Sequence, residues 1–289
     1  MASRFWVGGT GTWDASDTTH WSAASGGAGG ASVPGAADTV TFDANSGGGT
    51  VTVNTTVTVI SIACGAFTGT LDFSVNNNNV TLSGGTNAFS GTGTGARTIK
   101  LGNGTWTFTT TTTAGGVVWN MGTTTNLTFD AGSSVLNFSG DAVPTGGNAV
   151  RVMSGGNLAY ATIEVAAQSN GGKFNLSGAN TIGTLTVSGT NDLIVAGNQT
   201  IGTLSLNGTS TGLIVMESST SGQSRTISVA SNPPTLDWVA FRDITGAGGA
   251  SFVADNSFDL GRSVGITINA PGAGGGGAAQ LVDSGALVG

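Results

Sequence analysis

Charged side chains are scarce in this sequence. They make up 8% of its 289 residues, and eight Lys or Arg against fifteen Asp or Glu give a net charge of −7. The basic residues are scattered singly, without the patch or the aromatic-basic groove that a nucleic-acid partner would need. Thr, Ser, Asn and Gly fill most of the polar positions instead. Such a composition suits stacked strands, because like charges would repel one another from one strand to the next.

Cysteine and histidine each occur once. Cys64 cannot form an intrachain disulfide, and since nothing cationic flanks it we expect a buried, inert thiol on a strand. His20 lies in a tryptophan-rich segment with no second His or Cys nearby, which favours a structural hydrogen bond over metal binding or catalysis. The sequence therefore predicts no metal site and no cofactor.

Long apolar runs and ligand-binding loops are also missing. No stretch of about 18 apolar residues could insert into a membrane, and the N-terminus lacks the charged and apolar regions of a secretory signal peptide. Residues 91–97, GTGTGAR, have the glycines of a phosphate loop without its Lys-Ser/Thr ending. Residues 246–256 share only glycines with a calcium-binding nonapeptide, because Asp255 is displaced and the motif does not repeat. We expect neither ligand at these segments.

An internal repeat is the strongest positive signal. Residues 172–187 (GKFNLSGANTIGTLTV) are matched nineteen positions later by residues 191–206 (NDLIVAGNQTIGTLSL). Each unit holds two short alternating runs separated by small or amide residues, which predicts strand, turn, strand, turn. A unit of this size buries its apolar face only by stacking on the next unit, so the repeat predicts an all-β parallel β-helix or β-solenoid. The matched apolar pairs are Phe174 with Leu193, Leu176 with Val195, Ile182 with Ile201 and Leu185 with Leu204.

Alternating runs extend this pattern from residue 39 to about residue 270. At about twenty residues per coil they predict roughly eleven or twelve coils and a rod of about 55 Å. Residues 76–79, four consecutive asparagines, predict an amide-lined turn between two strands. Pro233 and Pro234 mark a break in the pattern, because two prolines cannot occupy a central strand.

The first forty residues differ from the coils. Trp6, Trp13 and Trp21, half of the six tryptophans, cluster here between glycine turns. A solenoid exposes an unpaired edge at each end, and an aromatic segment folded over the first coil would protect that edge. We therefore assign residues 1–40 to an N-terminal cap, which is also a candidate for assembly contacts. The alternative is a platform on which the tryptophan rings stack against a glycan.

The rest of the chain divides into three parts. Residues 41–232 are predicted to form the solenoid coils, and residues 233–270 the terminal coils with a C-terminal cap. Residues 271–289 are a glycine-rich tail that would be flexible by itself. We expect this tail to lie against a neighbouring subunit or a partner protein. Its predicted assembly contacts are Leu281, Val282 and Leu287.

Residues suited to catalysis are few. Aspartates at two places are close enough in the sequence to form a glycosidase couple, but they lie in turn-rich segments where Asp commonly closes turns. The two glutamates each fall at the edge of a predicted strand. We therefore expect no enzymatic activity and name no catalytic residue. The carboxylates considered are Asp14 with Asp17, Asp255 with Asp259, Glu164 and Glu217.

Two segments resemble modules of known proteins. Residues 4–47, RFWVGGTGTWDASDTTHWSAASGGAGGASVPGAADTVTFDANSG, resemble an N-terminal module of structural proteins of tailed bacteriophages and, more distantly, the opening of autotransporter-like β-helix repeats. Residues 236–268 are similar to the closing module of the same phage proteins. The two segments cover about a quarter of the chain and bracket the predicted coils. No catalytic residues carry over, and an autotransporter would also need a signal peptide and a membrane barrel.

The resemblance implies a non-enzymatic structural protein of a phage virion. We expect a fibre, spike or capsid decoration protein on the particle surface, attached to capsid or tail proteins and assembled as a homo-oligomer, with a trimer favoured. One alternative is an adhesin that binds a host-surface polysaccharide through exposed aromatic residues such as Trp106 and Trp119. A second alternative is a tailspike that depolymerises polysaccharide, which would need at least two carboxylates facing one groove.

Overall fold

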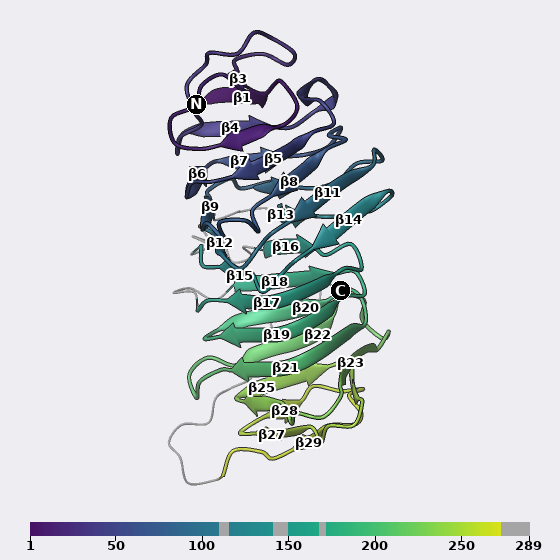
Figure 1. Cartoon of the computed structure of the whole chain (residues 1–289). Coiled ribbons are helices and arrows are strands. Elements are labelled where there is room, and N and C mark those ends of the chain that lie inside the picture. Colours follow the sequence, from purple (N-terminus) through teal and green to yellow (C-terminus); the bar gives the residue numbers. More distant parts are fainter. Residues whose placement is uncertain (110–115, 141–149, 168–171, 273–289) are drawn as a thin grey trace, which may run out of the picture.

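The chain folds into an elongated, all-β body. The structure is a computed structural model that describes residues 1–109, 116–140, 150–167 and 172–272. Over these ranges it consists of strands and turns with one short 3-10 helix, Ala44–Ser46. The strands lie in long sheets stacked along one axis, with the N-terminus near one end and the last strands at the other (Figure 1). The all-β class predicted from the sequence is confirmed.

One sheet, here called sheet A, contains twelve strands and runs the length of the body. Every neighbouring pair in it is parallel except β1 and β3, which are antiparallel. From one end to the other its strands are β3 (Trp21–Ser22), β1 (Ala2–Trp6), β4 (Asp38–Thr41), β7 (Ser61–Ala63), β10 (Phe89–Ser90), β13 (Val117–Asn120), β16 (Val150–Ser154), β18 (Gly172–Ser177), β20 (Asn191–Val195), β22 (Ile214–Ser218), β25 (Val239–Arg242) and β28 (Phe258–Asp259).

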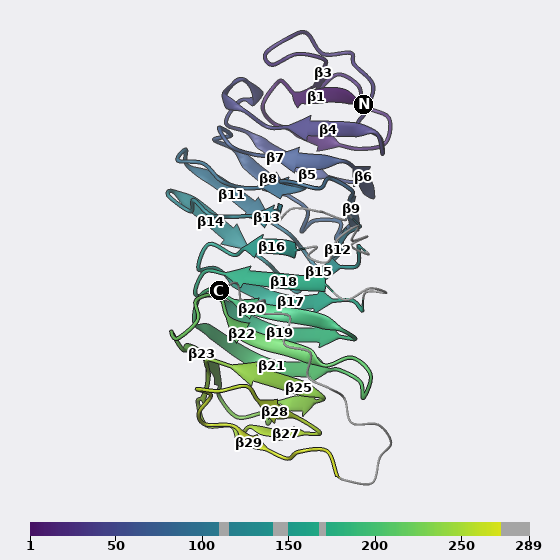
Figure 2. The same ribbon diagram turned by 180° about the vertical axis from the view of Figure 1, so that it is seen from behind.

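Sheet B is shorter and belongs to the N-terminal half, where its strands lie together in the rear view (Figure 2). It contains five parallel strands. They are β2 (Gly11–Trp13), β5 (Thr50–Val53), β8 (Thr70–Asp72), β11 (Arg97–Lys100) and β14 (Leu127–Asp130).

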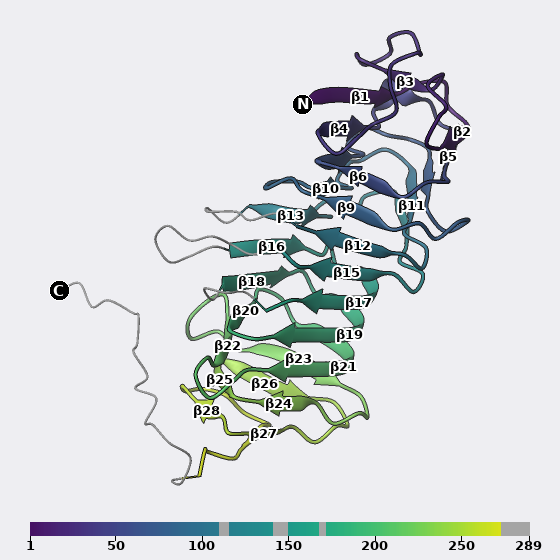
Figure 3. The ribbon, with the colours of Figure 1, turned by 90° about the vertical axis from the view of Figure 1, so that its left-hand side faces the viewer.

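Sheet C again runs along the stack and lies beside sheet A (Figure 3). All of its pairs are parallel. Its main path is β6 (Val57–Val59), β9 (Val80–Leu82), β12 (Thr105–Phe108), β15 (Val135–Phe138), β17 (Ala159–Val165), β19 (Thr181–Ser188), β21 (Gln199–Asn207), β24 (Thr235–Asp237), β27 (Val253–Asp255) and β29 (Thr267–Ile268). Beside this path, β23 (Arg225–Val229) pairs with β21 and β26 (Ile244–Ala247) pairs with β23.

The chain visits the sheets in a fixed order. Strands β4, β5 and β6 belong to sheets A, B and C, and β7, β8 and β9 repeat the circuit one layer further along. We call each circuit a rung. From β16 to β22 the chain alternates between sheets A and C. The long strand β21 then pairs with both β23 and β24, so each of the next two circuits places two strands in sheet C. This order is consistent with a β-solenoid.

The register of the predicted repeat is confirmed. Phe174 is paired with Leu193 and Leu176 with Val195 between β18 and β20. Ile182 and Leu185 of β19 are likewise paired with the residues nineteen positions later in β21. Each matched pair therefore stacks one rung above the other.

The spacing of nineteen residues does not hold along the whole chain. In the N-terminal half Trp106 is paired with Leu136, thirty residues later, because each rung there also includes a strand of sheet B. From Asp38 onward sheet A receives ten described strands. The estimate of eleven or twelve coils is therefore too high.

Stacking in register produces continuous inward columns of apolar side chains. In sheet C one such column passes through ten successive rungs, and nine of its ten residues are buried. Two of its rings, Phe108 and Phe138, are stacked with centroids 4.7 Å apart. Each large side chain buried in this way contributes roughly 1.5–3 kcal/mol. The column is Val59, Leu82, Phe108, Phe138, Val165, Val187, Leu206, Leu236, Ala254 and Ile268.

Two stacked glycines form a tight corner in the long strands of sheet C. Gly202 lies over Gly183, where an added Cβ would come within 2.6 Å of the Gly183 carbonyl oxygen. An added Cβ on Gly183 would in turn lie 2.5 Å from the carbonyl oxygen of Ala161. The two TIG sequences of the repeat thus contain glycine because neighbouring rungs approach closely there.

The asparagine run forms the predicted amide turn. Asn77 has φ of 53°, in the left-handed region that asparagine tolerates. Its side-chain oxygen accepts a hydrogen bond of 2.8 Å from the backbone N–H of Asn103, and Asn79 accepts one of 2.9 Å from Thr105. In the next rung Asn103 accepts from the N–H of Ser133 at 3.2 Å. The amides therefore connect successive rungs outside the sheets.

The two ends of the stack differ. At the N-terminal end β3 adds to β1 in the antiparallel direction, and β1 and β2 already belong to sheets A and B. At the other end sheet A finishes with β28 and sheet C with β29. Pro233 and Pro234 lie outside the strands, between β23 and β24, as the sequence predicts.

Replacement of Phe108 by alanine should lower the free energy of unfolding by about 3–5 kcal/mol, because it opens a cavity in the buried column. Replacement of the neighbouring Thr107, which faces outward on the same strand, should change it by less than about 1 kcal/mol. Urea unfolding followed by circular dichroism measures both values. Equal effects of the two substitutions would contradict the inward assignment.

Candidate functional site

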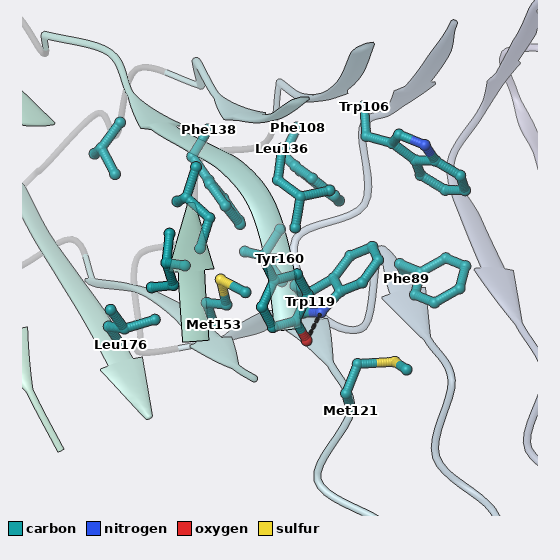
Figure 4. Packing of buried hydrophobic residues seen from close by; sticks show 14 of the residues in the cluster. Phe89, Trp106, Phe108, Trp119, Met121, Leu136, Phe138, Met153, Tyr160 and Leu176 are labelled. Carbon is teal, nitrogen blue, oxygen red and sulfur yellow. Dashed lines mark hydrogen bonds between the residues drawn. The ribbon is translucent and has the colours of Figure 1, made fainter. Parts of the chain in front are cut away.

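The tryptophans proposed to contact a glycan lie in the core. Trp106 and Trp119 are both 0% exposed. Trp119 is stacked on Phe89 with centroids 4.5 Å apart, and its Nε1–H donates to the hydroxyl of Tyr160 at 3.1 Å (Figure 4). Tyr160 in turn donates to the carbonyl oxygen of Gly155 at 2.7 Å. The prediction that these two tryptophans are exposed is wrong, because both occupy inward positions of their strands.

The N-terminal tryptophans are buried as well. Trp6 and Trp21 are 0% exposed and Trp13 is 1% exposed, and all three rings surround Phe42. The His20 ring stacks on Trp6 with centroids 4.6 Å apart, and its Nδ1 lies 2.8 Å from the carbonyl oxygen of Val7. A glycan could not reach these rings, so the stacking platform considered as an alternative is wrong. The cluster instead packs the first rung.

Three of the four aspartates considered for catalysis close turns. Asp14 accepts hydrogen bonds of 2.7 Å from the backbone N–H groups of Ser16 and Asp17, and these bonds lower the pKa of its carboxyl. Asp255 accepts from the side chain of Asn269 at 2.7 Å, and Asp259 accepts from a backbone N–H two residues later. Asp17 accepts hydrogen bonds from the backbone N–H of Thr19 at 2.8 Å and from its hydroxyl at 2.6 Å. Asp14, Asp17 and Asp259 thus have the turn role expected from the sequence, whereas Asp255, the last residue of β27, binds a side chain fourteen residues away.

Charged side chains gather on the outer face of sheet A near its C-terminal end. Glu217 of β22 forms an ion pair of 3.5 Å with Arg242 of β25. One strand earlier, Asp192 is paired in register with Lys173 of β18 and accepts a hydrogen bond of 3.1 Å from the N–H of Val215. Burial raises the pKa of Asp192, and the nearby charge of Glu217 acts in the same direction. Two carboxylates therefore lie on neighbouring strands, one of them half-buried.

Sequence reasoning did not single out Asp192, and it placed the glutamates at strand edges. The structure places Glu217 within β22 and Glu164, exposed, within β17. Asp192 and Glu217 come together only through the pairing of Ile194 with Glu217. Both residues occupy outward positions in runs of alternating apolar and polar residues. That alternation, together with the number of residues per rung, is the sequence signal that could have placed Asp192 near Glu217.

A buried arginine organises the segment that was rejected as a phosphate loop. Arg97 is 3% exposed and donates five hydrogen bonds to backbone carbonyl oxygens. Three of these acceptors lie in the glycine-rich segment just before it and two lie in the next rung. The segment thus directs carbonyl oxygens toward its own guanidinium, whereas a phosphate loop directs N–H groups toward its ligand. The acceptors are Gly91, Gly93, Gly95, Thr123 and Thr125.

Hydroxyl groups form columns on the outer faces of the sheets. On sheet B, threonines of four successive rungs are stacked in register, and on sheet C those of three rungs are. Neighbouring strands are about 4.8 Å apart, so the hydroxyls repeat at that interval along the rod. The surface therefore presents uncharged hydrogen-bonding groups in a regular array. The columns are Thr50, Thr70, Thr98 and Thr128 on sheet B, and Thr58, Thr81 and Thr107 on sheet C.

The single cysteine lies in the core. Cys64 is buried, and burial raises the pKa of its thiol to about 12, in agreement with the expected inert cysteine. Within the described ranges no three His, Cys, Asp or Glu side chains are grouped as a metal site would require. The same part of the chain contains no helix long and apolar enough to cross a membrane. Leu281, Val282 and Leu287 lie outside the described residues.

Comparison with known proteins identifies no relative. No family model, no curated protein and no solved structure matches the chain. Its function must therefore be argued from the residues and their arrangement.

Replacing Asp192 by asparagine should stabilise the protein at pH 7. The pKa of Asp192 is higher in the folded state, so stability falls as the pH rises from the unfolded pKa, and the whole loss is present above the folded pKa. The stabilisation should shrink as the pH falls through the folded pKa toward the unfolded one. Urea unfolding at pH 7 and pH 4 tests this, with Glu164→Gln as the control for an exposed carboxylate. A larger gain at pH 4 than at pH 7 would contradict the assignment.

Proposed function

We propose that this chain is a non-enzymatic structural protein of a tailed-phage virion, exposed on the particle as a fibre, spike or capsid decoration protein. We further propose that it is a right-handed parallel β-helix with a cap at each end. The observation that carries the proposal is the unbroken apolar column from Val59 to Ile268. The resemblance of residues 4–47 and 236–268 to modules of phage structural proteins supports the same assignment.

A stack of this kind suits a rod-shaped component. Ten described rungs at about 4.8 Å each give a rod of about 48 Å. Each rung is hydrogen-bonded to the rungs before and after it, so bending the rod would break backbone hydrogen bonds in more than one sheet. The columns of hydroxyls leave part of the outer surface of the N-terminal half uncharged. These properties support a rigid spacer or shield with a passive surface.

The C-terminal end of the stack is the proposed site at which the protein attaches to the particle. The rings of Trp6 and Trp13 at the opposite end are buried, which removes them as direct contacts. The C-terminal rungs instead carry two exposed apolar side chains, Val253 at 42% and Val264 at 57%. The glycine-rich tail that follows adds further apolar residues. We propose that this end, with the tail, binds capsid or tail proteins, and that three copies assemble there.

Cryo-electron microscopy of the intact particle should show the rod on its surface. Density on every capsomer would identify a decoration protein, and density only at the tail would identify a fibre or spike. Mass measurement in solution at micromolar concentration should give about three times 28.2 kDa. Absence of the rod from the purified particle would contradict the virion assignment, and a monomeric mass would contradict the trimer.

The adhesin alternative is weakened, because Trp106 and Trp119, the residues expected to contact a glycan, are buried. The depolymerase alternative gains one observation, the half-buried Asp192 beside Glu217 on the outer face of sheet A. If these carboxylates formed a glycosidase couple, the purified protein would release reducing ends from host polysaccharide. Asp192→Asn and Glu217→Gln would each reduce that release by at least about a hundredfold, whereas Glu164→Gln would not. We expect no release from the unaltered protein.

A further inference from the structure

The sequence contains three Asn-Gly dipeptides, and two of them, Asn103-Gly104 and Asn207-Gly208, lie in the described part of the chain. In such a dipeptide the backbone nitrogen of the glycine can attack the side-chain carbonyl carbon of the asparagine, because glycine has no Cβ to hinder the approach. Both asparagines are exposed to solvent. The two sites share this covalent chemistry, so a difference in their reactivity has to come from how the fold holds them.

The glycine nitrogens of the two sites are held differently. The N–H of Gly208 donates a hydrogen bond of 2.9 Å to the carbonyl oxygen of Asp237 in the adjacent strand β24. The N–H of Gly104 has no acceptor among the described residues, although the N–H groups on either side of it do have acceptors. Attack requires the nitrogen to give up its proton and bond to carbon, and a hydrogen bond to the next strand opposes that change. The nitrogen of Gly104 is therefore the freer nucleophile.

The two asparagine side chains differ as well. The side-chain oxygen of Asn103 accepts two hydrogen bonds from Ser133 of the next rung, one of 3.2 Å from the backbone N–H and one of 2.7 Å from the hydroxyl. Two donors at one carbonyl oxygen stabilise the negative charge that develops there during attack, as in an oxyanion hole. The side chain of Asn207 instead donates through its Nδ2 to the hydroxyl of Ser205 at 2.8 Å, and its oxygen accepts nothing from the described residues. The carbonyl of Asn103 is therefore the more activated one.

The fold requires both residues of the reactive dipeptide. An added Cβ at position 104 would lie 2.4 Å from the carbonyl oxygen of Asn78, so only glycine fits there between the rungs. Asn103 belongs to the amide ladder that connects the rungs, since its N–H donates to Asn77 and its side chain accepts from Ser133. The stacking of the rungs thus places an asparagine before an obligatory glycine.

We propose that Asn103 is a site of spontaneous modification, at which asparagine becomes aspartate or isoaspartate. The nitrogen of Gly104 forms a bond to Cγ of Asn103, and the Cγ–Nδ2 bond breaks. Ammonia leaves with the proton that the Gly104 nitrogen gives up, and a cyclic imide remains. Water then opens this ring at either of its carbonyl carbons, which yields the two products. The inference goes beyond the virion assignment and does not depend on it.

The modification changes the turn in two ways. Either product places a negative charge in a ladder whose other members, Asn77 and Ser133, are neutral. Isoaspartate also lengthens the main chain of the turn by an additional carbon atom, which moves the side-chain oxygen relative to the two donors of Ser133. The contacts between rungs outside the sheets are therefore weakened where the product is isoaspartate.

Peptide mass spectrometry tests the site. The folded, full-length protein is incubated at mildly alkaline pH, and loss of the amide is followed separately at Asn103 and Asn207. Asn103 should react at least about tenfold faster, because its nucleophile is free and its carbonyl is activated. In the urea-unfolded chain the two should react at similar rates, since both precede glycine. Equal rates in the folded protein, or a faster reaction at Asn207, would overturn the proposal.

A pair of serine variants tests the cause. Ser133→Ala removes the hydroxyl that donates to Asn103 and should slow the reaction there about tenfold. Ser133 is exposed, so this change leaves the core intact. The matched control is Ser205→Ala, which removes the partner of Asn207 and should leave the rate at Asn103 unchanged. An unchanged rate in Ser133→Ala would remove the hydroxyl from the explanation, and a faster one would show that it restrains the side chain; either result would overturn the proposal.

Discussion

Parallel backbone hydrogen bonding in constant register is the constraint on which this structure depends. Strand residues lie over their counterparts in the preceding rung, apart from a register shift between Val117 and Trp119 in β13. Side chains of the same kind therefore recur along a column. Inward columns are apolar for this reason, as in the run from Val59 to Ile268 in sheet C. Any charged residue in such a column would lack a partner above and below it.

The same constraint explains the low charge content. Like charges stacked at about 4.8 Å would repel one another, so outward columns use threonine, serine and asparagine instead. Some of the charges that do occur are matched between rungs, as in the ion pair of 3.1 Å between Lys100 and Asp72. Arg262 and Asp243 form a second matched pair, and that contact lowers the pKa of Asp243 to about 2. Such pairs fix register more than they add stability.

Because every rung needs a neighbour, the ends of the stack differ from its middle. The N-terminal end is closed by the antiparallel strand β3 and by the aromatic cluster around Phe42. Among the described residues the C-terminal end finishes with the short parallel strands β28 and β29.

Sequence alone determined the all-β class, the register of residues 172–206, the asparagine turn and the inert cysteine, because each depends on local alternation or on one repeated spacing. It did not determine the rung length in the N-terminal half, the burial of Trp119 or the meeting of Asp192 with Glu217. Rung length depends on how many sheets the chain visits per circuit, which alternation does not encode. Burial and proximity depend on which strands become neighbours, and only the tertiary structure decides that, through pairing between residues far apart in the chain.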